Sequence, residues 1–239
     1  MDSTSCPAEQ IILDAYRAEA PTLHYWFDNN EIQFLLSILN KLSVFVDVGA
    51  HVGTYTASIA PHIKLVHAFE PGAWPYSALL HILRTLKINN VMTYQMGLGN
   101  QAEFQTYKET KISTQGSYGT PLSSVIGWYP SMTFTLDMLV EMGIIERCDV
   151  IKIDTNGSEP LVIQGGKQFF DQFRPVVLCK MDFKKEYGFG CKPTDVLDLL
   201  PDYEWRVWDA DGRLVPLMGK MHLKPHFNVL GMPPGREKI

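Results

Sequence analysis

The segment that most constrains the fold is an apolar strand that runs into a glycine-rich turn and then a helix. Residues 44–48 read Val-Phe-Val-Asp-Val, a composition that predicts a parallel strand buried on both faces. Gly49 permits a tight turn and the close approach of a ligand, and Gly53 lets the start of a helix at about Thr54 lie against the strand. This order is typical of doubly wound α/β domains, which bind ligands at the carboxyl ends of their strands.

The rest of the chain continues the alternation of strands and helices. A helix is expected over 74–87, and another over 11–42, with one apolar face formed by Ile32, Leu35, Leu36, Leu39 and Leu42. Further strands are expected at 65–69, 91–96, 150–153, 176–179, 205–208 and 227–230. The pattern predicts an α/β fold with a doubly wound, mainly parallel seven-stranded sheet and an antiparallel finish. We expect residues 1–43 to form an N-terminal helical extension packed on a domain of residues 44–239.

Composition excludes several classes of protein. The net charge of -5 and the pI near 5.8 argue against a basic nucleic-acid-binding face. We find no signal peptide and no apolar run long enough to span a bilayer, so a cytoplasmic location is expected. The four cysteines form no Cys-x-x-Cys pair and fit reduced, mostly buried thiols, and no Cys/His cluster supports a metal site. The sequence does not indicate an oligomeric state.

The turn after the first strand suits a small anion. A pyrophosphate-binding turn needs Gly-x-Gly-x-x-Gly, but Ala50-His51 stands here in place of the middle glycine. Amides at the helix start then suit a carboxylate, such as that of methionine. Asp47 is costly to bury without a cation, which the amino group of methionine would supply. Glu70, followed by Pro71, ends the next strand, where its carboxylate can accept hydrogen bonds from both hydroxyls of a ribose.

S-adenosylmethionine carries both a methionine and a ribose, so we expect it as the cofactor. For the turn alone, a generic glycine-rich connection is the alternative, and Glu70 at the correct strand end favours the cofactor. The expected cofactor-binding residues lie at the carboxyl ends of the strands: Asp47, Gly49, Ala50, His51, Gly53, Thr54, Tyr55, Glu70, Pro71, Gly97 and Asp154.

Several blocks, in order from residue 44 to about 234, resemble the FkbM-type methyltransferases. They are residues 47–53, 68–71, 135–137, 151–159, 162–166, 174–178 and 227–230. The resemblance implies a Rossmann-like class I methyltransferase fold. It also implies methyl transfer from S-adenosylmethionine, usually to a hydroxyl of a sugar or a polyketide-like natural product. Three positions depart from the family pattern: His51 is commonly Asn, Thr155-Asn156 replaces Val-Glu, and Lys180 stands where Glu is typical.

Asp154 and Lys180 are the candidate catalytic residues. A hydroxyl acceptor loses a proton during methylation, so a base helps. Asp154 ends the fourth strand, where acceptor and sulfonium should meet, although it could instead bind the amides of residues 156–157. Lys180 could pair with Asp154 or Asp182 or, if buried with a lowered pKa, act as the base. Glu159 is acidic and lies beside Pro160 at an expected helix start, a position typical of helix capping.

Residues 106–134 form an unusually long connection, which predicts either a lid or acceptor wall, or an extra hairpin packed on the sheet edge. Two other functions stay open. An RNA ribose 2′-O-methyltransferase would use a Lys-Asp-Lys-Glu tetrad, for which Lys41, Asp154, Lys180 and Glu204 are candidates. A degenerate member would bind only the cofactor or a partner protein. The acidic net charge makes nucleic acid unlikely and favours a small-molecule or glycan acceptor.

Overall fold

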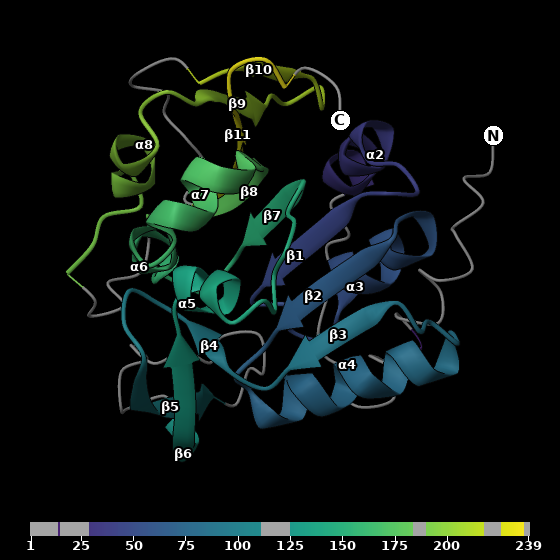
Figure 1. Cartoon of the computed structure of the whole chain (residues 1–239), viewed down its shortest axis with the longest axis vertical. Helices are drawn as coiled ribbons and strands as arrows, with labels where there is room; N and C mark the ends of the chain where they lie inside the picture. The colour runs from purple at the N-terminus through teal and green to yellow at the C-terminus, as the bar shows by residue number, and fades with distance from the viewer. Residues whose placement is uncertain (1–13, 15–28, 111–124, 184–189, 218–225, 237–239) are drawn as a thin grey trace.

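The computed structural model describes residue 14 and residues 29–110, 125–183, 190–217 and 226–236. The main sheet has eight strands in the order β10-β9-β11-β8-β7-β1-β2-β3 (Figure 1). Its strands are β1 (Val44–Val48), β2 (Leu65–Phe69), β3 (Val91–Tyr94), β7 (Val150–Ile153), β8 (Val176–Asp182), β9 (Glu204–Trp208), β10 (Leu214–Pro216) and β11 (His226–Met232).

All seven expected strands are present in this sheet. The five strands β1, β2, β3, β7 and β8 pair in parallel, and β11 is antiparallel to both β8 and β9, which confirms the antiparallel finish. The eighth strand, β10, pairs with β9 and is only three residues long, too short to show a periodic pattern in the sequence. Strand β8 is longer than expected because β11 pairs with it as far as Asp182. Lys180 therefore lies within β8 and does not follow it.

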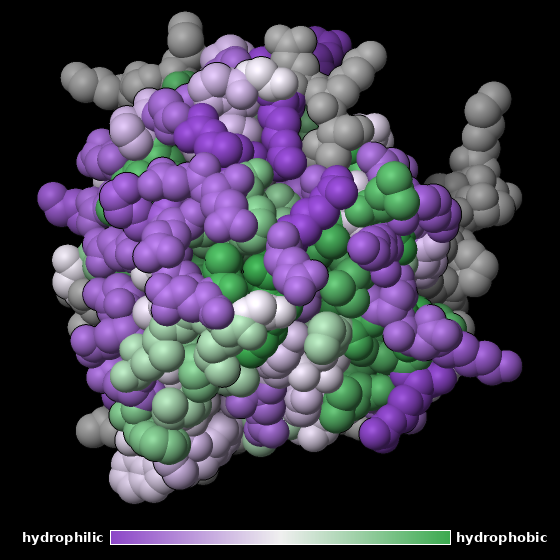
Figure 2. All heavy atoms as spheres, viewed as in Figure 1, coloured by the Kyte–Doolittle hydropathy of each residue, from purple (hydrophilic) through white to green (hydrophobic). Residues whose placement is uncertain are grey.

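Helices cover both faces of the sheet, as a doubly wound fold requires. On one face, Leu35, Ile59 and Leu79 pack against Phe45 and its neighbours. These side chains come from α2 (Asn29–Ile38), α3 (Thr54–Ile59) and α4 (Ala73–Thr85); a short 3-10 helix, η1 (Ala60–His62), follows α3. The other face is covered by α5 (Leu136–Glu141), α6 (Glu159–Gln164), α7 (Lys167–Phe173) and α8 (Asp195–Leu199). Figure 2 shows mainly hydrophilic residues over α6, α7 and α8, so the outer sides of these helices are polar.

Helix α2 ends earlier than the apolar pattern predicts. The helix stops at Ile38, and Leu42 is 67% exposed rather than part of the buried face. The side chain of Asn40 accepts a hydrogen bond from the amide of Leu42, and Ser43 Oγ accepts one from the amide of Asn40. These local bonds offer the backbone an alternative to the helix. The expected helix before residue 29 lies, except for residue 14, outside the described residues.

The long connection contains an antiparallel hairpin. Strands β5 (Glu103–Thr110) and β6 (Val125–Phe134) pair with each other, and β4 (Gly97–Leu98) joins β6 to complete a separate three-stranded sheet. A hairpin is therefore present, in a sheet of its own rather than in the main sheet; residues 111–124 lie outside the described part, and a role as lid or acceptor wall stays a prediction. The hydroxyl of Tyr129 donates a hydrogen bond to the carbonyl of Pro71 at 3.4 Å, which fixes the hairpin beside the end of β2.

None of the helices in the described ranges is both long and apolar enough to cross a membrane.

Candidate cofactor and acceptor site

The turn between β1 and α3 needs glycine for close packing within the chain. Gly49 has a φ of +79°, and a Cβ there would lie 2.0 Å from the carbonyl oxygen of Asp154. Gly53 has a φ of +88°, and its Cβ would lie 2.3 Å from Leu79 of α4. The sequence predicted a ligand next to Gly49 and the preceding strand next to Gly53, whereas the structure places the Asp154 carbonyl and Leu79 there. His51 has a φ of 55°, in a region where both His and Asn are enriched among non-glycine residues.

Three amides of this turn hold it against the end of β2. The amides of Gly49 and Ala50 both donate to the carbonyl of Phe69, at 2.9 and 3.0 Å. The amide of His51 donates to the Glu70 carboxylate at 2.8 Å. A cofactor carboxylate would have to compete with these bonds, so contact with the three amides stays a prediction. Helix α3 begins directly after the turn, at Thr54.

Glu70 joins the turns that follow β1 and β2. Its carboxylate is buried and accepts hydrogen bonds from the amides of His51 and Gly72, at 2.8 and 2.7 Å. Burial raises the pKa of Glu70 to about 7. Each carboxylate oxygen has a second lone pair, so the hydroxyls of a ribose could still donate to it. This buried acid fits the ribose-binding role predicted from the sequence.

Asp47 has a protein cation as its partner. The side chain is fully buried, its Oδ2 accepts a hydrogen bond from Thr56 Oγ1 at 2.7 Å, and its Oδ1 lies 3.4 Å from Lys152 Nζ. The sequence correctly indicated that a buried aspartate needs a cation, but it assigned that role to the amino group of methionine. Lys152 was missed, although one signal was present: it is the charged residue of an otherwise apolar strand, β7. Contact between Asp47 and the cofactor stays a prediction.

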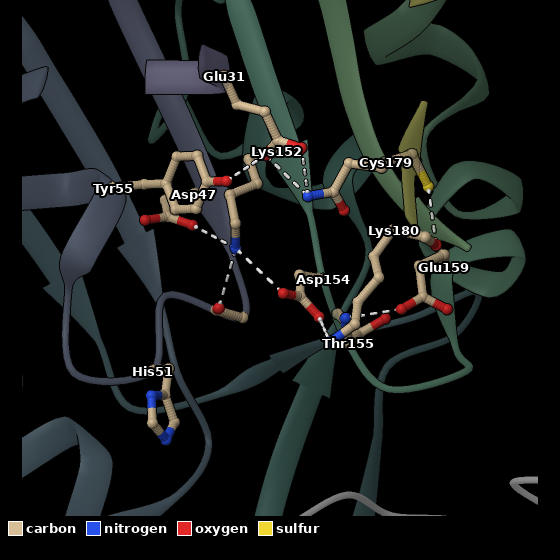
Figure 3. A network of polar contacts seen from close by, with 12 residues as sticks. Glu31, Asp47, His51, Tyr55, Lys152, Asp154, Thr155, Glu159, Cys179 and Lys180 are labelled. Atoms are coloured by element: carbon tan, nitrogen blue, oxygen red, sulfur yellow. Dashed lines mark hydrogen bonds and ion pairs between the residues drawn. The ribbon is translucent and has the colours of Figure 1, made fainter. Parts of the chain in front are cut away.

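Asp154 and Lys180 lie together at the carboxyl edge of the sheet (Figure 3). Lys180 Nζ is 3.0 Å from Asp154 Oδ1, and the two side chains are 27% and 30% exposed. Lys152 Nζ lies 3.8 Å from the other oxygen of Asp154. Although burial acts to raise the pKa of Asp154, the ammonium groups of Lys180 and Lys152 hold it below the usual value. The predicted convergence of Asp154 and Lys180 is confirmed, and their catalytic roles stay predictions.

The structure contradicts the alternative in which Lys180 has a lowered pKa. The negative charge of Asp154 raises the pKa of Lys180, so the side chain is an ammonium at neutral pH. An ammonium can hold an anion but cannot accept a proton. Lys180 is therefore a cation of the site rather than its base.

Glu159 binds the amide of Gly157, one of the two turn amides that were the alternative partners expected for Asp154. Its two oxygens accept from the amides of Thr155 and Gly157, at 2.8 and 2.9 Å. Glu159 begins α6 but binds the preceding turn, in which Asn156 and Gly157 both have positive φ. Burial raises the pKa of Glu159 to about 7. Glu159 thus holds the loop after β7, and the Asp154 carboxylate lies beside Lys152 and Lys180.

Tyr55 and Gly97 occupy different parts of this edge. The hydroxyl of Tyr55 donates to Glu31 of α2, and the Tyr55 ring lies 4.9 Å from Lys152 Nζ. Glu31 also accepts two hydrogen bonds from Asn228, at 2.9 and 2.8 Å. Gly97 is buried in β4, opposite Thr133 of β6. Glu31 and Asn228 were not predicted, because residues so far apart in the chain show no local pattern.

The four candidates for an RNA-methylating tetrad do not assemble. Lys41 Nζ donates to the carbonyl of Pro61, before the parallel strands begin, and Glu204 pairs with Arg206 at the start of β9. Asp154 and Lys180 lie at the opposite, carboxyl edge. The tetrad assignment is therefore wrong for these residues.

The edge that holds Glu70 and Asp154 fits S-adenosylmethionine. Glu70 offers a buried carboxylate to hydroxyl donors, and Asp154 is open to solvent. Next to Asp154, Thr155 Oγ1 is buried without a hydrogen-bond partner within the described structure, a state that calls for an explanation such as a ligand or a water molecule. Among the described side chains, no group of three or more His, Cys, Asp and Glu residues could hold a metal ion.

Comparison with known proteins gives a family. Residues 47–207 match the sequence model of the methyltransferase FkbM domain. A curated relative, the hexuronic acid methyltransferase AglP of Haloferax volcanii, is 26% identical over 175 residues, which cover 73% of this chain and 68% of AglP.

Solved structures share the fold. A methyltransferase FkbM of Methylobacillus flagellatus superposes with a TM-score of 0.52 at 15% identity, covering 92% of this chain. This chain spans only 58% of the length of that protein. SMU.1697c of Streptococcus mutans, solved in complex with S-adenosylhomocysteine, has a TM-score of 0.52 at 12% identity, covering 87% of this chain and 98% of the other.

Proposed function

The chain belongs to the family of FkbM methyltransferase domains, with S-adenosylmethionine as its cofactor, and on this premise we propose that it methylates a hydroxyl group of a sugar. The observation that carries the proposal is the Asp154–Lys180 pair, at 3.0 Å and open to solvent at the carboxyl edge. Ligands of doubly wound folds bind at that edge. Glu70 and the β1–α3 turn lie at the same edge.

Asp154 would hold the acceptor hydroxyl. When bound, S-adenosylmethionine supplies an electrophilic methyl group. The acceptor hydroxyl loses its proton as its oxygen gains that methyl. A carboxylate with a lowered pKa is a weak base, so Asp154 would act mainly by accepting a hydrogen bond from the hydroxyl and fixing its direction. The carboxylate or a solvent molecule would then take the proton.

Lys180 favours an acceptor that carries a carboxylate. The side chain is a partly exposed ammonium beside Asp154, and a carboxylate on the sugar would form a charge-assisted hydrogen bond with it. AglP is a hexuronic acid methyltransferase, which is consistent with such an acceptor. We therefore infer that a hexuronic acid is the class of sugar that this site accepts.

Paired sugars test this proposal. Methyl glucuronide and methyl glucoside differ in a carboxylate and can be supplied with the same methyl donor. We expect the glucuronide to be the better acceptor, and Lys180→Met to raise its KM roughly tenfold with little change for the glucoside. Lys167→Met is the matched control because Lys167 forms an exposed pair with Asp171.

Two results would contradict the proposal. Binding of S-adenosylhomocysteine in calorimetry without turnover of sugar, lipid or RNA would favour the non-catalytic alternative. Turnover of RNA alone would favour a ribose methyltransferase that uses residues other than the dispersed tetrad.

A further inference from the structure

We propose that Lys152 is a positioning residue. It couples the turn between β1 and α3 (the cofactor turn, residues 49–53) to Asp154, and it keeps Asp154 ionised when an acceptor binds Lys180. Its part in the reaction rests on the proposed function, whereas its effects on Asp154 and on cofactor binding can be measured without an acceptor.

Lys152 is the point at which the two halves of the site meet. Its side chain is only 6% exposed, and its ammonium lies 3.3 Å from the carbonyl of Gly49, 3.4 Å from Asp47 Oδ1 and 3.8 Å from Asp154 Oδ2 (Figure 3). Gly49 and Asp47 belong to the cofactor turn and its strand, and Asp154 belongs to the acceptor side. A buried ammonium needs such partners, so it holds all three groups in place.

A second set of contacts fixes the ammonium from the other side. The ring of Tyr55 lies 4.9 Å from Lys152 Nζ, a cation–π distance. The Tyr55 hydroxyl donates to Glu31, which also accepts from Asn228. Asn228 stands directly opposite Lys180 in the pairing of β11 with β8. Residues of α2, α3 and β11 thus hold Lys152 from this second side.

The two lysines beside Asp154 differ in how exposed their side chains are. Lys180 is 27% exposed and lies 3.0 Å from Asp154, so an anionic acceptor can draw it away. Lys152 is buried and tied to Asp47, so it stays. With Lys180 engaged elsewhere, Lys152 remains as the cation that stabilises the carboxylate. The charged and titratable groups around Asp154 and Lys152 include Asp47, His51, Tyr55, Glu159, Cys179, Lys180 and Asp182.

The direct test is the pKa of Asp154 in the cofactor-free protein. Carbon-13 NMR of labelled aspartate carboxyls would follow its titration, with Asp154→Asn identifying the signal. We expect Lys152→Gln to raise the pKa of Asp154 by about one pH unit, and Lys152→Gln with Lys180→Met to raise it further. Lys167→Met should leave it unchanged. An unchanged pKa in Lys152→Gln would overturn the proposal.

Cofactor affinity tests the coupling to the turn. We expect Lys152→Gln to weaken S-adenosylhomocysteine binding roughly tenfold in calorimetry, because Asp47 and the Gly49 carbonyl lose their cation. If Lys152→Gln does not fold, Asp47→Asn/Lys152→Gln removes the unpaired charge, and both measurements are compared with Asp47→Asn alone. Wild-type affinity for S-adenosylhomocysteine in Lys152→Gln, or in its pair with Asp47→Asn, would overturn the coupling to the turn, because Lys152 would then only neutralise a buried charge. If the wild type binds S-adenosylhomocysteine but does not methylate a sugar, the proposed function is contradicted, and both tests of Lys152 can still be carried out.

Discussion

The affinity for S-adenosylhomocysteine should rise with pH because Glu70 must be ionised to receive the ribose. Burial raises the pKa of Glu70 to about 7, so in the free protein much of the side chain is protonated at neutral pH. A carboxylate accepts hydrogen bonds from hydroxyls more strongly than a carboxylic acid does. Binding therefore favours the ionised form, and affinity should increase as pH rises through about 7.

The expected size follows from the ionised fraction. With a pKa of about 7, roughly one-eleventh of Glu70 is ionised at about pH 6 and roughly ten-elevenths at about pH 8. The dissociation constant should thus be about tenfold lower at the higher pH. Removing the charge with Glu70→Gln should cost about 1.5–3 kcal/mol of binding free energy at pH 8, which corresponds to a roughly 10- to 150-fold weaker complex.

Calorimetry at several pH values would measure both effects, with circular dichroism confirming that the turns held by Glu70 still fold. Glu159→Gln is the matched control, because Glu159 has the same raised pKa, about 7, but binds the loop after β7. That variant should keep the pH dependence, and Glu70→Gln should lose it. Equal affinity of the wild type at pH 6 and pH 8, or an unchanged slope in Glu70→Gln, would refute the reasoning.

Three further predictions concern the turn, the loop and the acceptor side. Gly49→Val should lower the free energy of unfolding, measured in urea, by about 3 kcal/mol or more, because a Cβ would meet the Asp154 carbonyl at 2.0 Å. The control Gly127→Ala has open space around it and should lower that free energy by under ~1 kcal/mol. Equal decreases in the two variants would contradict this reasoning. The buried Glu159, with its pKa raised to about 7, binds more protons folded than unfolded, so stability should fall by up to ~3 kcal/mol as pH rises from about 4.5 to about 7. Thermal unfolding should show a smaller fall in Glu159→Gln, and identical curves would exclude this cause. Asp154→Asn should reduce turnover of a hexuronic acid on the order of 10²-fold while cofactor affinity barely changes; wild-type turnover would remove Asp154 from the reaction.

The sequence by itself determined the positions of the main strands and the edge that carries the site. The run over 44–48 and its counterparts are mainly apolar, a local property that buried parallel strands require. Gly49 and Glu70 follow two such strands, so both had to lie at the carboxyl edge of the sheet.

The ends of the elements were decided by tertiary contacts. Pairing with β11 extended β8 to Asp182, and pairing with β9 made a strand of three residues, β10. Helix α2, by contrast, ended at Ile38, before the apolar pattern did, because local side-chain bonds at Asn40 and Ser43 compete with the helix. Such boundaries depend on partners elsewhere in the chain, or on polar bonds that outweigh a hydrophobic periodicity.

The electrostatics of the site belong wholly to the tertiary structure. The sequence indicated that Asp47 needs a cation, but only the parallel register of β1 and β7, which sets Asp47 beside Lys152, supplies it. The same packing places two lysines beside Asp154, while the amide of Gly157, an expected alternative partner of Asp154, donates to Glu159. Charge interactions fall off over a few ångströms in this partly buried edge, so the partners of each group follow from which strands are neighbours, and that arrangement is fixed by the core on both faces of the sheet.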